Sequence, residues 1–144
     1  MRLRQADPAD LPALTRLEQE TLENPWTTEQ LAEELARPDS RCLVAEEGGA
    51  VTGYALARLA AGVLELLRIG VSPAHRRRGV GGALLTAVVE AARHGGAEEI
   101  WLEVRAGNRA AIALYERGGF SRVGLRPRYY DHPPEDALLF QRTP

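Results

Sequence analysis

The chain contains 144 residues, of which 44% are hydrophobic and 26% are charged, and its formal net charge is -2. This length predicts one domain covering residues 1–144. The small acidic excess argues against direct nucleic-acid binding, which usually requires a basic surplus. All 18 cationic side chains are arginines, and the chain has no lysine.

The cysteine, histidine and hydropathy patterns argue against a disulfide-bonded, metal-binding, secreted or membrane-spanning protein. The single cysteine, Cys42, leaves no intramolecular disulfide, which fits a reducing compartment. The three histidines are scattered without metal-ligand spacing, so we expect no metal site. The amino terminus lacks the apolar segment of a signal peptide, and no stretch approaches the length of a membrane span. We therefore expect a cytoplasmic protein with no membrane partner.

The first third of the chain predicts a short strand followed by two helices. The strand covers about residues 3–5. Asp7 and Pro8 are typical of a helix start, as N-cap and first helical residue, and leucines at helical spacing continue that helix. A second helix begins at Thr27, where Gln30 completes a capping box, and it ends before Pro38.

The remainder predicts a strand-rich mixed fold. Strands cover about residues 41–46, 51–59 and 63–71, with turns at residues 48–49 and 61–62. A helix over 80–94, a strand over 99–105, a short helix over 108–118 and strands over 120–126 and 137–142 follow. The order is β-α-α-β-β-β-α-β-α-β-β. It predicts an α/β fold, in which a single mixed β-sheet is flanked by helices on both faces.

One stretch between a strand and a helix carries the clearest chemical signal, Arg76-Arg77-Arg78-Gly79-Val80-Gly81-Gly82. Glycines let the backbone approach a ligand closely, and the N–H groups at a helix start favour an anion. The pattern indicates a phosphate-binding loop, with a glycine-rich turn and solvated arginines as the alternative. A Walker loop requires a lysine, and a dinucleotide fingerprint requires a third glycine where this chain has Leu84.

Within this stretch, Arg76-x-x-Gly79-x-Gly81 resembles the Arg/Gln-x-x-Gly-x-Gly/Ala signature of the GCN5-related N-acetyltransferases (GNAT). The predicted element order is similar to that family as well. The resemblance implies that residues 76–82 hold the pyrophosphate of acetyl-CoA. It also implies that the end of the preceding strand pairs with the pantetheine arm and donates an N–H group to the oxyanion, through Ile69, Gly70 and Val71. Gly70 fits such a close approach, with a simple bulge as the alternative.

The segment from Trp101 to Glu116 resembles the bacterial ribosomal protein S18 alanine N-acetyltransferases, the RimI subfamily. Pro25-Trp26 and Arg128-Tyr129-Tyr130 are similar to that subfamily too, so the resemblance covers nearly the whole chain. It implies transfer of acetyl to the N-terminal amine of a protein, in the first place the N-terminal alanine of ribosomal protein S18. Another protein terminus or a small amine as acceptor, a non-catalytic acyl-CoA binding module and a mononucleotide-binding domain are the alternatives.

Two residues of this segment bear on the chemistry. Strand alternation places Glu103 on the face opposite the more aliphatic side, and the resemblance implies that it is the proton acceptor; a solvated carboxylate paired with an arginine is the alternative. Tyr115 is the candidate acid and a cofactor contact, because a phenol with pKa near ~10 can protonate a thiolate with pKa near ~8.5. Aromatic packing is its alternative. Asn108 caps the short helix, and the resemblance implies that it also contacts acetyl-CoA.

The acceptor groove is expected between residues 23–26 and 128–132. Trp26, Tyr129 and Tyr130 would form its aromatic walls, while Glu23 and Asp131 would meet a cationic N-terminal region. Each of these side chains has an ordinary surface role as its alternative. Residues 129–134 are expected to form a short, proline-stiffened loop that departs from the subfamily and affects peptide preference rather than chemistry.

Overall fold

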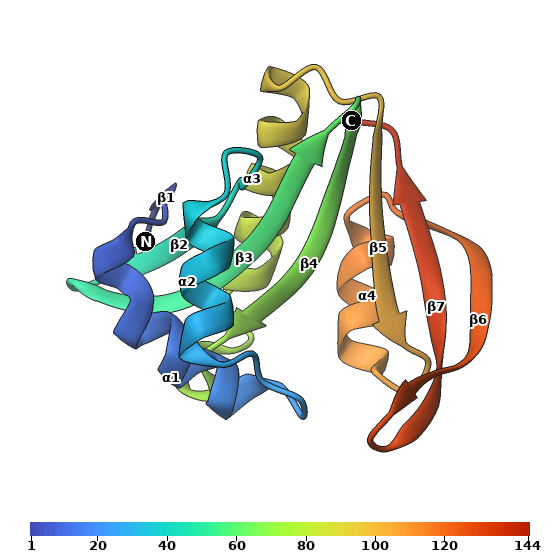
Figure 1. The fold of residues 1–144 in the computed structure, drawn as a ribbon, viewed down its shortest axis with the longest axis horizontal. Coiled ribbons are helices and arrows are strands. Elements are labelled where there is room, and N and C mark those ends of the chain that lie inside the picture. The colour runs from blue at the N-terminus through green and yellow to red at the C-terminus, as the bar shows by residue number, and fades with distance from the viewer.

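The computed structural model describes residues 1–144 and contains one seven-stranded sheet with strand order β1-β2-β3-β4-β5-β7-β6 (Figure 1). The strands are β1 (Arg2–Gln5), β2 (Leu43–Glu47), β3 (Ala50–Ala60), β4 (Val63–Val71), β5 (Glu99–Arg105), β6 (Ser121–Asp131) and β7 (Pro134–Arg142). Only β4 and β5 pair in parallel, and every other neighbouring pair is antiparallel. The sheet is therefore mixed, as predicted.

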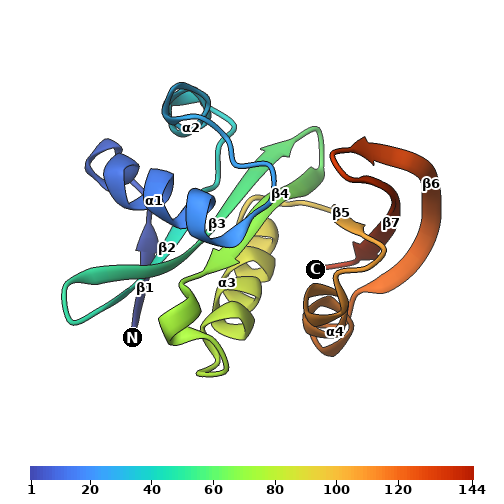
Figure 2. The same ribbon diagram turned by 90° about the horizontal axis from the view of Figure 1, so that it is seen from below.

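Helices cover both faces of this sheet, as Figure 2 shows. They are α1 (Leu11–Thr21), α2 (Thr28–Ala36), α3 (Val80–His94) and α4 (Arg109–Arg117), with short 3-10 helices at Pro8–Asp10 and Pro73–His75. One hydrophobic cluster packs α3 and α4 against the sheet, and a smaller one packs α1 and α2 on the opposite face. None of the helices is both long enough and apolar enough to cross a membrane.

The helix starts follow the capping residues closely. The Thr27 hydroxyl accepts from the Gln30 N–H, and the Gln30 side chain accepts from the Thr27 N–H, so the predicted capping box is confirmed. Asp7 is also an N-cap, but the turn that it caps is the 3-10 helix, and α1 begins only at Leu11. The prediction of a single helix starting at Pro8 was therefore wrong at its first turn.

The carboxyl-terminal hairpin is longer than predicted. Residues 129–134 were expected to form a loop, yet Tyr130 pairs with Glu135 and Asp131 with Pro134, which leaves a tight turn at residues 132–133. The prolines at positions 133 and 134 had suggested that the strand pairing would end before them. Because β6 is an edge strand and Pro134 is the first residue of β7, these prolines remove no hydrogen bond that the sheet needs.

The sheet opens between its two parallel strands. β4 and β5 pair only from Val63 to Leu66 against Glu99 to Leu102. Beyond that point Leu67 forms a bulge on β4, since Leu56 pairs with Arg68 whereas Ala57 pairs with Leu66. The second halves of the two strands then diverge (Figure 1). This divergence places backbone and side chains of both strands around a cavity inside the sheet.

Candidate active site

A cavity of about 250 Å³, here called the central pocket, occupies the opening between β4 and β5. It is lined by Leu22, Glu23, Asn24, Leu67, Arg68, Ile69, Glu103, Val104, Arg105, Asn108, Ala111, Tyr115 and Tyr130. Both candidate catalytic residues therefore border one cavity, although they come from different elements. Glu103 comes from the middle of β5, and Tyr115 comes from α4.

Glu103 faces away from the larger core, as the alternation of β5 predicted. Its neighbours Leu102 and Val104 are buried, whereas its own side chain is 30% exposed. The Arg126 Nε lies 3.6 Å from the Glu103 Oε1, so the expected arginine pair also exists. Glu103 raises the pKa of the neighbouring Tyr129 phenol. A partly exposed carboxylate at the edge of a cavity has the access that a general base needs.

Tyr115 is 5% exposed, and its ring packs against Phe120 and Phe140 with centroid distances of 6.1 and 6.3 Å. The expected packing role is thus present together with the position on the central pocket. Burial raises the pKa of the Tyr115 phenol, because removal from water disfavours the phenolate. The phenol therefore carries its proton at neutral pH.

A larger cavity of about 610 Å³, the α3 pocket, lies at the start of α3. Ten of the residues predicted to contact acetyl-CoA line it, namely Ile69, Gly70, Val71, Arg76, Arg77, Gly79, Val80, Gly81, Gly82 and Asn108. Arg78 does not line it, and Tyr115 lines only the central pocket. Four residues border both cavities, Leu22, Ile69, Asn108 and Ala111, so the two cavities adjoin.

The loop before α3 has the features of an anion cradle. Gly79 is the N-cap of α3 in the left-handed conformation, with φ of 81°. The N–H groups of residues 76–79 donate no backbone hydrogen bond, and those of the first helical turn have no intrahelical partner. Gly81 and Gly82 add no side chain in front of these groups, while Arg76 and Arg77 supply positive charge. This arrangement fits a diphosphate.

Gly70 is a glycine for a reason that the sequence did not reveal. A Cβ atom at this position would lie 2.7 Å from the Tyr54 Cε1 and 2.8 Å from the Thr21 Oγ1. The bulge in β4 is at Leu67, so the alternative that Gly70 marks the bulge was wrong. Gly70 still lines the α3 pocket, and pairing of this strand end with a ligand arm remains a prediction.

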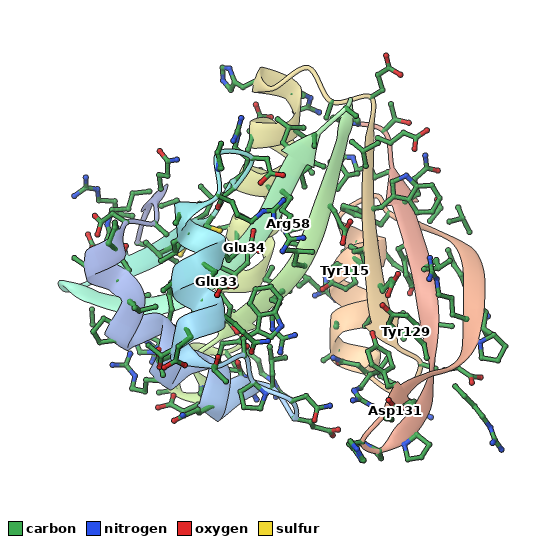
Figure 3. All side chains as sticks on the ribbon, in the orientation of Figure 1. Glu33, Glu34, Arg58, Tyr115, Tyr129 and Asp131 are labelled. Atoms are coloured by element: carbon green, nitrogen blue, oxygen red, sulfur yellow. The ribbon has the colours of Figure 1, made fainter.

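A third cavity of about 440 Å³, the aromatic groove, lies on the α1–α2 side of the opening and contains Trp26, Tyr129 and Tyr130. Glu103 borders both this groove and the central pocket. Asp131 borders none of these three cavities and lies near the tip of the β6–β7 hairpin (Figure 3). That Asp131 meets a cationic region of the acceptor stays a prediction.

A buried cluster that sequence reasoning missed supports the groove. Glu18 is fully buried and accepts hydrogen bonds from the Arg68 Nε at 2.9 Å, the Trp26 N–H at 2.8 Å and the Tyr54 hydroxyl. The Arg68 guanidinium also stacks on Trp26, 5.1 Å from the ring centroid. Glu18 follows Leu14 by four residues on the apolar stripe of α1, which was the available signal for a buried carboxylate.

A second set of contacts, also missed, joins the two segments expected to line the groove. The Asn24 side chain donates to the His132 carbonyl at 2.8 Å, and Arg105 donates to the same carbonyl at 3.1 Å. The Arg105 guanidinium also lies 4.2 Å from the Tyr130 ring centroid and 3.3 Å from Glu135. The α1–α2 connection and the β6–β7 hairpin are thus held together across the central pocket.

The fold and the site together define an acyl-CoA-dependent N-acyltransferase. The chain belongs to the acetyltransferase (GNAT) family, whose model matches residues 11–120. It is 37% identical over 150 residues to the N-alpha-acetyltransferase RimI of Mycobacterium tuberculosis, a match that covers 94% of this chain and 93% of the relative. The protein is therefore an N-acetyltransferase of the RimI type.

Solved structures agree with this assignment. The fold matches the ribosomal-protein-S18-alanine N-acetyltransferase from Escherichia coli with a TM-score of 0.92 at 30% identity, covering 99% of this chain and 92% of that one. It matches yncA from Salmonella typhimurium, solved with its cofactor acetyl-CoA, with a TM-score of 0.84 at 28% identity, covering 99% and 92%. The predicted family and sheet architecture are confirmed.

Proposed function

We propose that the protein transfers acetyl from acetyl-CoA to the N-terminal α-amine of a protein, with the N-terminal alanine of ribosomal protein S18 as the first acceptor to test. The position of Glu103 carries this proposal, because the carboxylate borders both the aromatic groove and the central pocket. An amine that enters along the groove meets this carboxylate before it reaches Tyr115. The names of the relatives, which specify N-α-acetylation and S18 alanine, support the same acceptor class.

The diphosphate would lie on the N–H groups before α3, with Arg76 and Arg77 balancing its charge. The thioester would then reach the opening beside Ile69 and Asn108, which border both adjoining cavities. These contacts orient the acyl carbon toward the carboxylate side, and positioning of this kind supplies much of the rate enhancement in two-substrate reactions.

Starting from the ammonium form, the acceptor nitrogen must lose two protons, and the departing sulfur must gain one. Glu103 accepts a proton from the acceptor ammonium, and the neutral amine nitrogen forms the new bond to the thioester carbon as the carbon–sulfur bond breaks. Tyr115 donates its proton to the departing thiolate, and the nitrogen loses its second proton as the amide forms. That second proton restores the Tyr115 hydroxyl through solvent, and the proton held by Glu103 leaves to solvent. An α-amine, with pKa near ~8, needs less assistance from the base than a lysine amine near ~10.4.

A peptide acetylation assay tests this function. A peptide copying the S18 amino terminus should gain one acetyl group at its α-amine, as located by fragmentation mass spectrometry. The same peptide with a blocked terminus but a free lysine should react far more slowly. Acetylation confined to the lysine, or transfer only to small amines, would contradict the proposed acceptor.

A further inference from the structure

Three of the four aromatic side chains that line the groove have an arginine guanidinium over the ring. Arg68 stacks on Trp26, Arg105 on Tyr130 and Arg126 on Tyr129, with distances from guanidinium carbon to ring centroid of 5.1, 4.2 and 5.5 Å. In all three cases the arginine also contacts a carboxylate. The partners are Glu18 at 2.9 Å, Glu135 at 3.3 Å and Glu103 at 3.6 Å. Three of the four aromatic rings that line the groove thus belong to the same kind of unit, in which an arginine contacts both the ring and a carboxylate.

The fourth aromatic residue of the groove, Trp101, has a carboxylate beside it and no arginine. Glu65 on β4 is the direct register partner of Trp101 on β5, and both side chains line the groove. The Trp101 Nε1 donates to the Glu99 Oε2 at 2.6 Å, which fixes the indole. Glu65 is exposed and takes part in none of the ion pairs or side-chain hydrogen bonds of the structure. The pair of Trp101 and Glu65 therefore has no arginine of the kind that the other three aromatic residues have.

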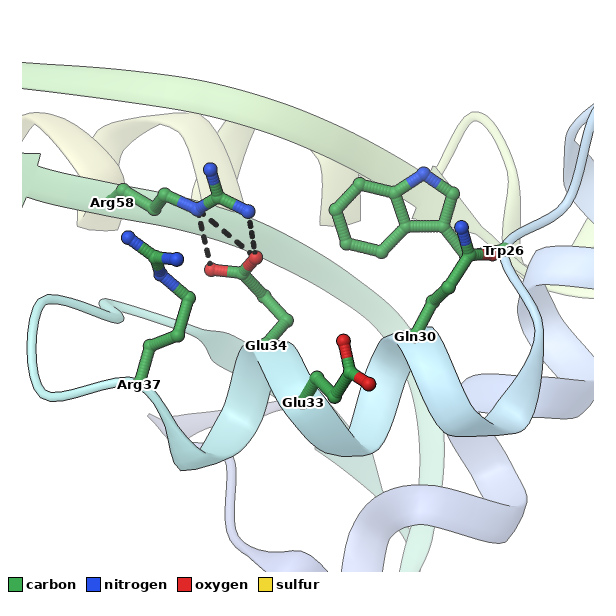
Figure 4. Close-up of a pocket in the computed structure, with 6 residues that line it drawn as sticks. All are labelled: Trp26, Gln30, Glu33, Glu34, Arg37 and Arg58. Atoms are coloured by element: carbon green, nitrogen blue, oxygen red, sulfur yellow. Dashed lines mark hydrogen bonds and ion pairs between the residues drawn. The ribbon is translucent and has the colours of Figure 1, made fainter.

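Arg58 is the nearest candidate within the chain to supply that cation. It faces Glu65 from the neighbouring strand β3. However, its guanidinium is directed at the buried Glu34, with the Nε at 3.0 Å and the terminal nitrogen at 2.5 Å from the carboxylate (Figure 4). The other arginines of the groove are held by Glu18 and Glu103. Glu65 is consequently the one carboxylate of the groove without a paired cation.

We propose that Glu65 and Trp101 form a subsite for a cationic side chain at the second or third residue of the acceptor. The proposal rests on the proposed function, in which the acceptor amine lies at Glu103. The Cα atoms of Glu65 and Glu103 are about 8 Å apart, because Glu103 lies two residues along β5 from Trp101, and Trp101 lies one strand spacing from Glu65. An extended acceptor advances at most ~3.6 Å per residue, so a long side chain on either residue reaches Glu65. The charge attracts the cation, and the indole face adds a cation–π contact.

The test measures kcat/KM for four peptides that begin with alanine and carry arginine at position 2, arginine at position 3, neither, or glutamate at position 2. The wild-type enzyme should favour arginine at one of the two positions by about five- to tenfold, mainly through KM. Glu65→Gln should remove the preference, mainly by raising KM for the favoured arginine peptide. Glu65→Arg should favour the glutamate peptide.

Glu33→Gln is the matched control, because Glu33 is an acidic residue on a separate pocket beyond Trp26 (Figure 4) and should keep the arginine preference. Equal kcat/KM for all four peptides in the wild type would overturn the subsite alone. So would an arginine preference that survives in Glu65→Gln. Acetylation of none of the peptides would overturn the proposed function, and the subsite with it.

Discussion

At the scale of single residues, the proposed chemistry depends on two groups in different surroundings. Glu103 keeps 30% of its side chain exposed and can exchange a proton with solvent, whereas Tyr115 is buried and holds its proton. We expect Glu103→Gln to lower kcat/KM about 100- to 10,000-fold, the range for loss of a general base. Steady-state kinetics with a peptide acceptor measure this. Glu90→Gln, in an exposed pair on α3, is the control and should retain wild-type rates.

Tyr115→Phe isolates the hydroxyl from the ring. The ring contacts with Phe120 and Phe140 persist in this variant, so its melting temperature should stay close to that of the wild type. Because the departing thiolate loses its proton donor, kcat should fall by about 100-fold or more, with little change in KM for either substrate. An unchanged kcat would show that Tyr115 only packs, and would remove it from the mechanism.

At the scale of elements, the left-handed residue at the start of α3 shapes the anion cradle. Gly79→Ala and Gly96→Ala both force an alanine into positive φ, at 81° and 71°, with no neighbour near the added Cβ. Each should cost about 1–2 kcal/mol of stability. Only Gly79→Ala should also weaken coenzyme A binding, by about tenfold or more, since it alone reorients the free N–H groups. Calorimetric titration compares the two variants, and equal affinities would contradict the cradle.

The contact between α1 and β4 depends on the buried Glu18. Removal of this carboxylate leaves Arg68 and Tyr54 without their partner, so Glu18→Ala should lower the free energy of unfolding by about 3–5 kcal/mol. Chemical denaturation measures the loss. Glu90→Ala removes an exposed pair and should change stability by no more than about 0.5 kcal/mol. A similarly small effect for Glu18→Ala would mean that the cluster contributes little to the fold.

The sequence predicted the elements best where local chemistry sets their ends. The bounds of β4, α3 and β5 match the predicted ranges 63–71, 80–94 and 99–105, because glycines and a proline flank them. It failed at the β6–β7 hairpin, where edge position decides whether a proline is tolerated. In the site, strand alternation placed Glu103 correctly. The pairing of Arg126 with Glu103 and of Glu65 with Trp101 depends on strand register, which no local pattern encodes.

At the scale of the whole molecule, the opening in the sheet joins three cavities into one path. Ile69 and Asn108 connect the α3 pocket to the central pocket, and Glu103 and Tyr130 connect the central pocket to the aromatic groove. The first half of the chain supplies one wall of the opening, and the second half supplies the other. In the proposed reaction, the two substrates approach from opposite sides and meet at the divergence of β4 and β5.

The composition of the whole chain also limits which side chains can change the free energy of unfolding at alkaline pH. The chain has no lysine, and arginine keeps its charge, so its side chains titrating between pH 8 and 12 are chiefly Cys42 and the tyrosines. Burial raises the pKa of Cys42 above its ordinary value of 9.0, and raises those of Tyr54 and Tyr115 above 10.0. Above these ordinary values the unfolded chain loses protons that the folded chain keeps.

Because the unfolded state then binds fewer protons, the free energy of unfolding should be constant up to about pH 9 and fall as pH rises further. Each buried group contributes a slope approaching ~1.4 kcal/mol per pH unit. Denaturant titrations between pH 7 and 11.5 measure this curve. Above pH 10, Tyr115→Phe should reduce this slope by the contribution of one buried group. A free energy of unfolding that stays constant to pH 11.5 would show that these phenols and the thiol ionise freely in the folded protein.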